Sequence, residues 1–201
     1  MSARLPHRLR AARLAAAIAL VAASGCGGPL ISYFNNSFDG EKGDSYHAAE
    51  GFEPTALGEV VVISPFETGP RGPIICCGKD ASTFATKFND VTTAPVKLVT
   101  IPNGAHPADY RRVLEEQGAE ELARMLGIAP TFDTVIFGAV EEHEGFLRAV
   151  HGYSADITMR VEALGADGRP RFEGTSRVQY PADTIARESA KVISEHVAGR
   201  R

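Results

Sequence analysis

The chain has 201 residues, 44% of them hydrophobic, and its 21 basic and 25 acidic residues give a formal net charge of −4. Residues 1–25 hold four of the arginines and no acid, so the remainder carries 17 basic and 25 acidic residues. This negative balance argues against nucleic acid or an anionic lipid face as the partner, because both require positive charge. The length suits one domain with a terminal segment.

Residues 1–25 have the pattern of a bacterial export signal. Four arginines are followed by an apolar run at residues 14–23 and then by Ser24, Gly25 and Cys26. A basic region, a short apolar region and small residues at its end are typical of a signal peptide. The apolar run is shorter than the roughly 20 residues that a membrane-spanning helix needs.

Small residues directly before Cys26 resemble the cleavage box of bacterial lipoproteins, although Ala23 stands where leucine is usual. The resemblance implies that Cys26 becomes the acylated N-terminus, with palmitate among its acyl chains. The alternative is a plain secretory signal in which Cys26 is incidental. Gly27 is not the aspartate that retains lipoproteins in the inner membrane of enteric bacteria, so we expect an outer-membrane anchor facing the periplasm.

Three domain-level segments are expected. Residues 1–25 are a lipoprotein signal peptide, and residues 26–58 are a flexible tether because turn-forming residues dominate them. Residues 59–201 are a single α/β domain that begins with a β-branched run at residues 60–66. Continuous runs of this kind are typical of strands buried on both faces.

The order of elements predicts a βαβαβ core. Strands are expected at residues 60–66, 96–101 and 135–140, with amphipathic helices after the first and the second. Such alternation favours parallel pairing through right-handed crossovers. The polar residues 141–144 are expected where the sheet leaves its helical cover.

Two alternating strands and a helix follow the core. Apolar and polar residues alternate over 153–163 and again over 171–180, and the sequence Gly-Ala-Asp-Gly between them is typical of a hairpin turn. A final helix is expected over about 182–197. The predicted fold is therefore α/β (α+β), a βαβαβ core extended by an antiparallel hairpin and closed by a C-terminal helix.

The adjacent Cys76 and Cys77 leave three interpretations open: a vicinal disulfide, two thiols or an intermolecular link, and a redox or metal function. An exported protein favours oxidised thiols. The surrounding glycine-rich segment lies where a phosphate loop would lie, but its spacing and Asp80 depart from the Walker pattern. We therefore expect no nucleotide and no other cofactor.

His143, His151 and Glu141 belong to the one His/carboxylate cluster in the sequence. If a bend brings the two histidines together, these three residues could bind a metal. The alternative is a solvated strand end, and we expect no metal and no catalytic residue. Arg160, Arg171 and Arg177 alternate outward on the hairpin and are candidates for a partner surface, with a solvated sheet face as the alternative.

The segments VVVISPF, VKLVTIP and DTVIFGAVEEHEG, followed by the hairpin and the last helix, resemble bacterial envelope lipoproteins of the curli-secretion-lipoprotein fold. That group includes lipoprotein activators of penicillin-binding proteins and the N-terminal domain of the Tol-system β-propeller protein. The resemblance covers residues 59–201 and implies a non-enzymatic role in assembly, secretion or activation. The segments that build the curli membrane barrel are missing, which argues against pore formation.

These features together predict a lipid-anchored, periplasm-facing lipoprotein that acts as a protein-interaction or assembly domain. Its partners would be envelope proteins and the membrane, through the lipid anchor, and it could form oligomers. One alternative is a metal- or redox-linked envelope enzyme that uses His143 and His151 or Cys76 and Cys77. Another alternative is a ring-forming secretion component.

Overall fold

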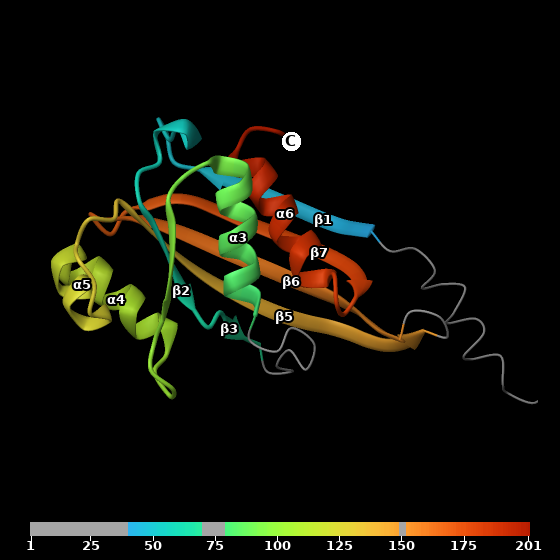
Figure 1. Cartoon of the computed structure of the whole chain (residues 1–201). Helices are drawn as coiled ribbons and strands as arrows, with labels where there is room; N and C mark the ends of the chain where they lie inside the picture. Colours follow the sequence, from blue (N-terminus) through green and yellow to red (C-terminus); the bar gives the residue numbers. More distant parts are fainter. Residues whose placement is uncertain (1–39, 70–78, 149–151) are drawn as a thin grey trace, which may run out of the picture. The chain divides into compact units, whose positions relative to one another are not determined.

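The computed structural model describes residues 40–69, 79–148 and 152–201 (Figure 1). The strands are β1 (Gly40–Ala48), β2 (Val60–Ser64), β3 (Glu67–Thr68), β4 (Val96–Thr100), β5 (Thr134–Arg148), β6 (Gly152–Gly165) and β7 (Pro170–Pro181). The helices are the 3-10 turn η1 (Pro54–Ala56), α3 (Asp80–Thr92), α4 (Pro107–Gln117), α5 (Ala119–Leu126) and α6 (Ile185–Val197).

The strands form one mixed sheet in the order β1-β7-β6-β5-β2-β4, and β3 pairs with β5 beyond the end of β2. β2 is parallel to both β4 and β5, whereas β5, β6, β7 and β1 pair antiparallel in succession. The predicted parallel core, the hairpin and the closing helix are therefore confirmed.

Burial explains the β-branched sequence of β2. Every residue of this strand is buried, and Val60 to Ile63 are fully inaccessible to solvent. Alternate side chains of a strand point to opposite faces, so β2 contributes to two separate cores. Helices α3 and α6 cover one face, and they lie side by side in Figure 1.

The core under α3 and α6 contains a row of phenylalanines. Phe66, Phe84, Phe88 and Phe172 contact one another in sequence, with ring centroids 5.5 to 6.0 Å apart. Offset and tilted aromatic pairs of this kind add to the stability that burial provides. They join the segment after β2, helix α3 and strand β7, which are distant in sequence, into one packed layer.

The core on the other face lies under α4 and α5. The sequence pattern predicts one helix between the second and third strands of the parallel core, and the structure has two short helices there. Gly118 separates them with a φ of +84°, which is a conformation that favours glycine. Tyr110, Leu114 and Leu122 pack there against Val61, Ile63, Val135 and Phe137.

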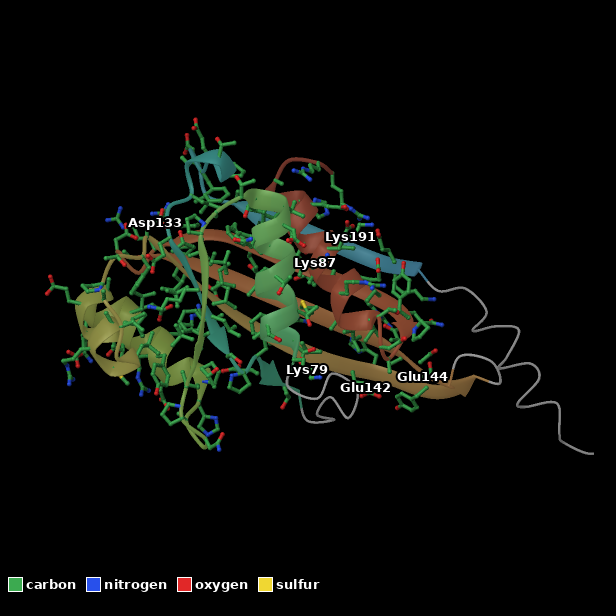
Figure 2. All side chains as sticks on the ribbon, in the orientation of Figure 1. Lys79, Lys87, Asp133, Glu142, Glu144 and Lys191 are labelled. Carbon is green, nitrogen blue, oxygen red and sulfur yellow. The ribbon has the colours of Figure 1, made fainter. Side chains whose placement is uncertain are left out.

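Strand β5 continues past the predicted end of the third strand. The polar residues 141–144 do not leave the sheet, because β5 remains paired with β6 up to Arg148. A register shift between Glu142 and Glu144 marks a bulge at this point, and bulges re-aim side chains without ending a strand. Figure 2 shows Asp133 and Glu144 near opposite ends of β5.

Strand β1 differs from the expected tether. It lies within residues 26–58, yet it pairs with β7 from Gly40 to Ala48. Charged and small residues make this segment resemble a loop, and its pairing depends on contacts with the C-terminus. The sheet therefore begins before Glu59, and of the expected tether residues 26–39 lie outside the described residues.

An ion-pair cluster attaches β1 to the end of α6. Arg201 donates to Glu41 Oε2 at 2.6 Å, to Asp44 Oδ2 at 3.2 Å and to Glu195 Oε2 at 3.1 Å. The His196 ring lies 2.6 Å from Asp44 Oδ2 and stacks on the Tyr46 ring. We call these residues the β1 clamp.

The clamp makes the attachment of β1 pH-dependent. The hydrogen bond from Arg201 lowers the pKa of Glu41, and the hydrogen bond from His196 lowers the pKa of Asp44. A lowered folded pKa gives stabilisation that is complete above the unfolded carboxyl range of about 4 and is lost as the pH falls through the folded values.

Replacing Arg201 with alanine should therefore loosen β1. Surface ion pairs contribute about 0.2–1 kcal/mol each, so we expect roughly fivefold faster hydrogen exchange of the β1 amides at neutral pH. Hydrogen exchange with mass spectrometry measures this rate. The protection of the β1 amides relative to their intrinsic exchange rate should fall below about pH 4 in the native chain, and R201A should show a smaller fall. Unchanged β1 exchange in R201A would show that the backbone ladder alone holds the strand.

Gly138 allows the close approach of a ring to β5. A Cβ at this position would lie 2.6 Å from three carbons of the Phe66 ring. Phe66 is 4% exposed and belongs to the core under α3. The ring has no room to move without disturbing Phe84, which lies 5.8 Å from it between centroids.

Gly138→Ala should lower the free energy of unfolding by about 1–3 kcal/mol, the range found for overpacked cores. Gly43→Ala is the matched control, because a Cβ at Gly43 on β1 meets no atom within 4 Å. Urea denaturation of both variants tests the prediction. Equal stability of the two variants would contradict it.

Candidate functional site

The hairpin presents a polar face on the side away from α3 and α6. Met159 and Val161 point into the core under those helices, so the alternate residues of β6 point to the other side. The same alternation applies to β7, which is paired with β6 throughout. We define the hairpin face by Glu141, Thr158, Arg160, Glu162, Glu173, Thr175 and Arg177.

Helices α4 and α5 cover only part of this side of the sheet. Their core takes Val135 and Phe137 from β5 and Leu164 from the end of β6. Arg160, Glu173 and Arg177 are exposed. The described helices thus bury the parallel half of the sheet on both sides and leave charged side chains of the hairpin accessible.

A groove runs between α4 and the hairpin face. One hollow of about 310 Å³ lies beside Pro107 and Arg111 of α4, and a second of about 210 Å³ lies beside Thr68 and Glu141. Glu67 and Arg160 line both hollows. Glu67 also accepts a hydrogen bond from the Ala108 backbone N–H at 3.2 Å, which fixes the start of α4 beside the groove.

At one end of the groove, carboxylates outnumber the basic side chains that pair with them. Arg111 donates to Glu115 at 2.9 Å and to Glu162 at 2.8 Å. Burial raises the pKa of Glu162, and the neighbouring carboxylates of Glu173 and Glu115 add to this rise while Arg111 opposes it. Glu162 and Glu173 lie directly opposite each other on β6 and β7, so this end of the groove carries concentrated negative charge.

Arg177 has a structural partner. Its Nε and Nη2 donate to the two carboxylate oxygens of Asp156, both at 2.9 Å. The Asp156 side chain is 11% exposed and that of Arg177 is 48% exposed. The fork of two parallel hydrogen bonds fixes the guanidinium against the Asp156 carboxylate and raises the pKa of Arg177.

The three arginines named from the sequence do not form one cluster. Arg160 faces Thr175 in the ladder and Arg177 faces Thr158, so these two are diagonal neighbours. Arg171 lies at the other end of the hairpin, 3.8 Å from Asp133. The Arg160 side chain makes no ion pair or hydrogen bond with any residue that the structure describes.

His143 lies at the bulge of β5. Its Nε2 is 2.7 Å from the Thr158 hydroxyl, so the ring lies on the hairpin face. Glu141 is exposed on the same face. His151 lies outside the described residues, and the described ones contain no group of three His, Cys, Asp or Glu residues that could hold a metal. The pairing of His143 with His151 stays a prediction.

The remaining named residues also lie outside the described part. They are Cys26, Cys76 and Cys77, so lipidation and the vicinal disulfide stay predictions. Among the described helices, none has the length and apolar character needed to cross a membrane.

The groove was missed at the sequence level. In the sequence, Glu162 and Glu173 are only polar positions of alternating strands, and no pattern distinguishes Glu67 or Arg111. Their alternation could have placed Arg160, Glu162 and Glu173 on one face. The approach of α4 to that face depends on tertiary packing that no short pattern in the sequence carries.

The chain matches no protein-family model and no curated protein. Its fold is similar to that of PelC from Paraburkholderia phytofirmans, solved as a dodecamer in two crystal forms. A singly substituted PelC has a TM-score of 0.51 and 16% identity, over 78% of this chain and 97% of that chain. Another PelC structure has a TM-score of 0.51 and 14% identity, over 79% of this chain and 99% of that chain.

The similarity to PelC shows a shared fold. Both PelC chains are matched almost completely, so the sheet and helices described here correspond to a whole PelC subunit. The comparison therefore shows the fold alone, and the resemblance to the curli-secretion-lipoprotein group stays a prediction.

Substitutions of Arg177 and Arg160 should affect stability differently, because only Arg177 forms an ion pair with a nearly buried carboxylate. Arg177→Ala leaves the nearly buried Asp156 carboxylate without its fork, and we expect a loss of about 1–3 kcal/mol in the free energy of unfolding. Arg160→Ala breaks no side-chain ion pair or hydrogen bond with the described residues and should change stability by less than about 0.5 kcal/mol. Urea denaturation measures both. A larger loss in R160A than in R177A would contradict this assignment.

Proposed function

We propose that this chain is a lipid-anchored, periplasm-facing lipoprotein of the bacterial envelope whose domain assembles with other proteins and has no catalytic role. The observation that carries the proposal is the hairpin face, where arginines and carboxylates lie on a sheet surface that the described helices cover only in part. Arg160 is central to it, because it lines both hollows of the groove and has no partner among the described residues.

The chemistry of this face suits protein recognition. Exposed charges of both signs give an interface its orientation and its rate of association more than its affinity. Arginine is enriched where protein surfaces meet, since its planar guanidinium can bind a carboxylate with two hydrogen bonds. An acidic side chain of a partner could pair with Arg160 while its basic side chains meet Glu162 and Glu173.

Assembly with copies of itself is part of the proposal. The fold is shared with PelC, whose structures are dodecamers. Rings of identical subunits form when one surface of each copy binds a different surface of the next. The same fold in this chain supports a ring or a smaller closed oligomer.

The anchor would then act through a short linker. If Cys26 is acylated, residues 27–39 separate it from β1, and a flexible chain of this length has a root-mean-square span of about 20 Å. Confinement within that distance of the membrane raises the effective concentration of each copy for its neighbours and for membrane-bound partners.

Photo-crosslinking in intact cells tests the interaction surface. A photoreactive residue at Thr175, beside Arg160, should yield specific protein adducts, and Arg160→Glu should reduce their yield at least about tenfold, as expected for 1.4 kcal/mol or more. Arg187→Glu is the matched control, because Arg187 is an exposed arginine of α6 that pairs only with its neighbour Glu188 among the described residues. Absence of any protein adduct, together with turnover of a small substrate by the purified protein, would overturn the proposal.

A further inference from the structure

A second groove lies between α3 and the edge strand β4. It has a volume of about 370 Å³, with Ala85, Val96 and Leu98 as its apolar part. Leu98 is 39% exposed, which is unusual for a large apolar side chain in the middle of a strand. The polar rim consists of Ser82, Thr86, Asn89 and Asp90 along α3.

The strand beside this groove is open on its outer side. β4 pairs with β2, and no other strand of the described part pairs with it. An edge strand presents unpaired N–H and C=O groups that an additional strand can use. An edge strand flanked by a helix is a geometry in which extended peptides are bound, with hydrogen bonds from the strand and one side chain under the helix.

We propose that residues 30–34 of a second copy of this chain occupy this groove as an added strand. The sequence Leu-Ile-Ser-Tyr-Phe is uncharged and rich in β-branched and aromatic residues, which suit a strand. Alternate side chains of the added strand would point to the same face. Either Ile31 and Tyr33, or Leu30 and Phe34 on the opposite face, could therefore cover Leu98 and Ala85. The Tyr33 hydroxyl would meet the polar rim of α3.

Chain length argues against the same copy as donor. Five strand spacings separate β1 from β4 in the sheet, or about 24 Å at ~4.8 Å each. In the ladder, Gly40 aligns with Glu144 through β7 and β6, whereas Leu98 aligns with Ile136 through β2. On β6 these positions correspond to Asp156 and Ala163, and the offset of seven residues adds about 23 Å at ~3.3 Å per residue.

The direct distance from Gly40 to Leu98 is therefore about 33 Å by this geometry. The chain from Ser32 to Gly40 spans at most about 28 Å when fully extended, and it would also have to pass around the domain. A segment centred on Ser32 thus falls short of the β4 groove of its own domain and is free to reach that of a neighbour.

The exchange gives the assembly a direction. Each copy would donate from the β1 edge of its sheet and accept at the β4 edge, which is a head-to-tail contact that closes into a ring when the rotation permits. Acylated Cys26 of the donor would lie within about 14 Å of residue 30, so the accepting edge would face the membrane. This inference rests on the proposed self-assembly.

Crosslinking from Tyr33 tests the contact directly. A photoreactive amino acid at Tyr33 in the full chain, purified in detergent as a mixture of light and heavy isotope-labelled copies, should crosslink light to heavy chains. The adducts should map to residues 82–98. Crosslinks confined to one copy, adducts elsewhere on the domain, or capture only of a different protein would overturn the proposal.

A charge placed in the groove tests its role in assembly. Leu98→Asp should shift the detergent-solubilised full chain to monomers, with at least about a tenfold rise in the dissociation constant. Met125→Asp is the matched control, because Met125 is a comparably exposed apolar residue, at 41%, on α5 of the other face. Measurement of mass by light scattering distinguishes the two variants, and circular dichroism confirms that both are folded.

The outcomes separate the two proposals. A monomeric native chain would remove the self-assembly on which the exchange rests. An oligomeric native chain whose mass is unchanged by L98D, with Tyr33 adducts outside residues 82–98, would retain self-assembly and reject the strand exchange. Loss of the oligomer in L98D but not in M125D, together with light-to-heavy adducts at residues 82–98, would support both.

Discussion

The burial of β2 from both sides determines how the rest of the molecule is arranged. Val60 to Ile63 have no access to solvent, so helices must cover both faces of the sheet around them. Crossovers through α3 and through α4 and α5 supply these covers and place β4 and β5 on either side of β2. The parallel half of the sheet is therefore a closed body with two cores.

The hairpin does not need helices on both of its faces. β5, β6 and β7 extend beyond the parallel half, where α6 and α3 continue to cover one face and α4 and α5 cover the other only in part. Burial on one side requires only alternate apolar residues, which frees the remaining positions for charge. The groove, the exposed Arg160 and the Glu162–Glu173 pair all follow from the limited length of α4 and α5.

Sequence reasoning succeeds where the burial pattern is local. The β-branched run of β2 and the alternation in β6 and β7 predict buried and half-buried strands directly, and the βαβαβ order predicts parallel pairing. β1 was missed because Glu41, Lys42 and Asp44 resemble a loop, and the clamp that holds it comes from Arg201 at the far end of the chain. The groove was missed because it needs α4 and β6 together.

The two edges of the sheet have opposite chemistry, and this asymmetry bears on the proposed assembly. β1 is charged and is held by the clamp, features that discourage pairing with a further strand. β4 is five residues long, with Leu98 exposed beside a groove. In a protein with two equally open sheet edges, a neighbouring copy could add a strand at either edge. With one edge protected and the other open, addition at β4 alone is favoured, so successive copies would join in a single orientation, as a closed ring requires.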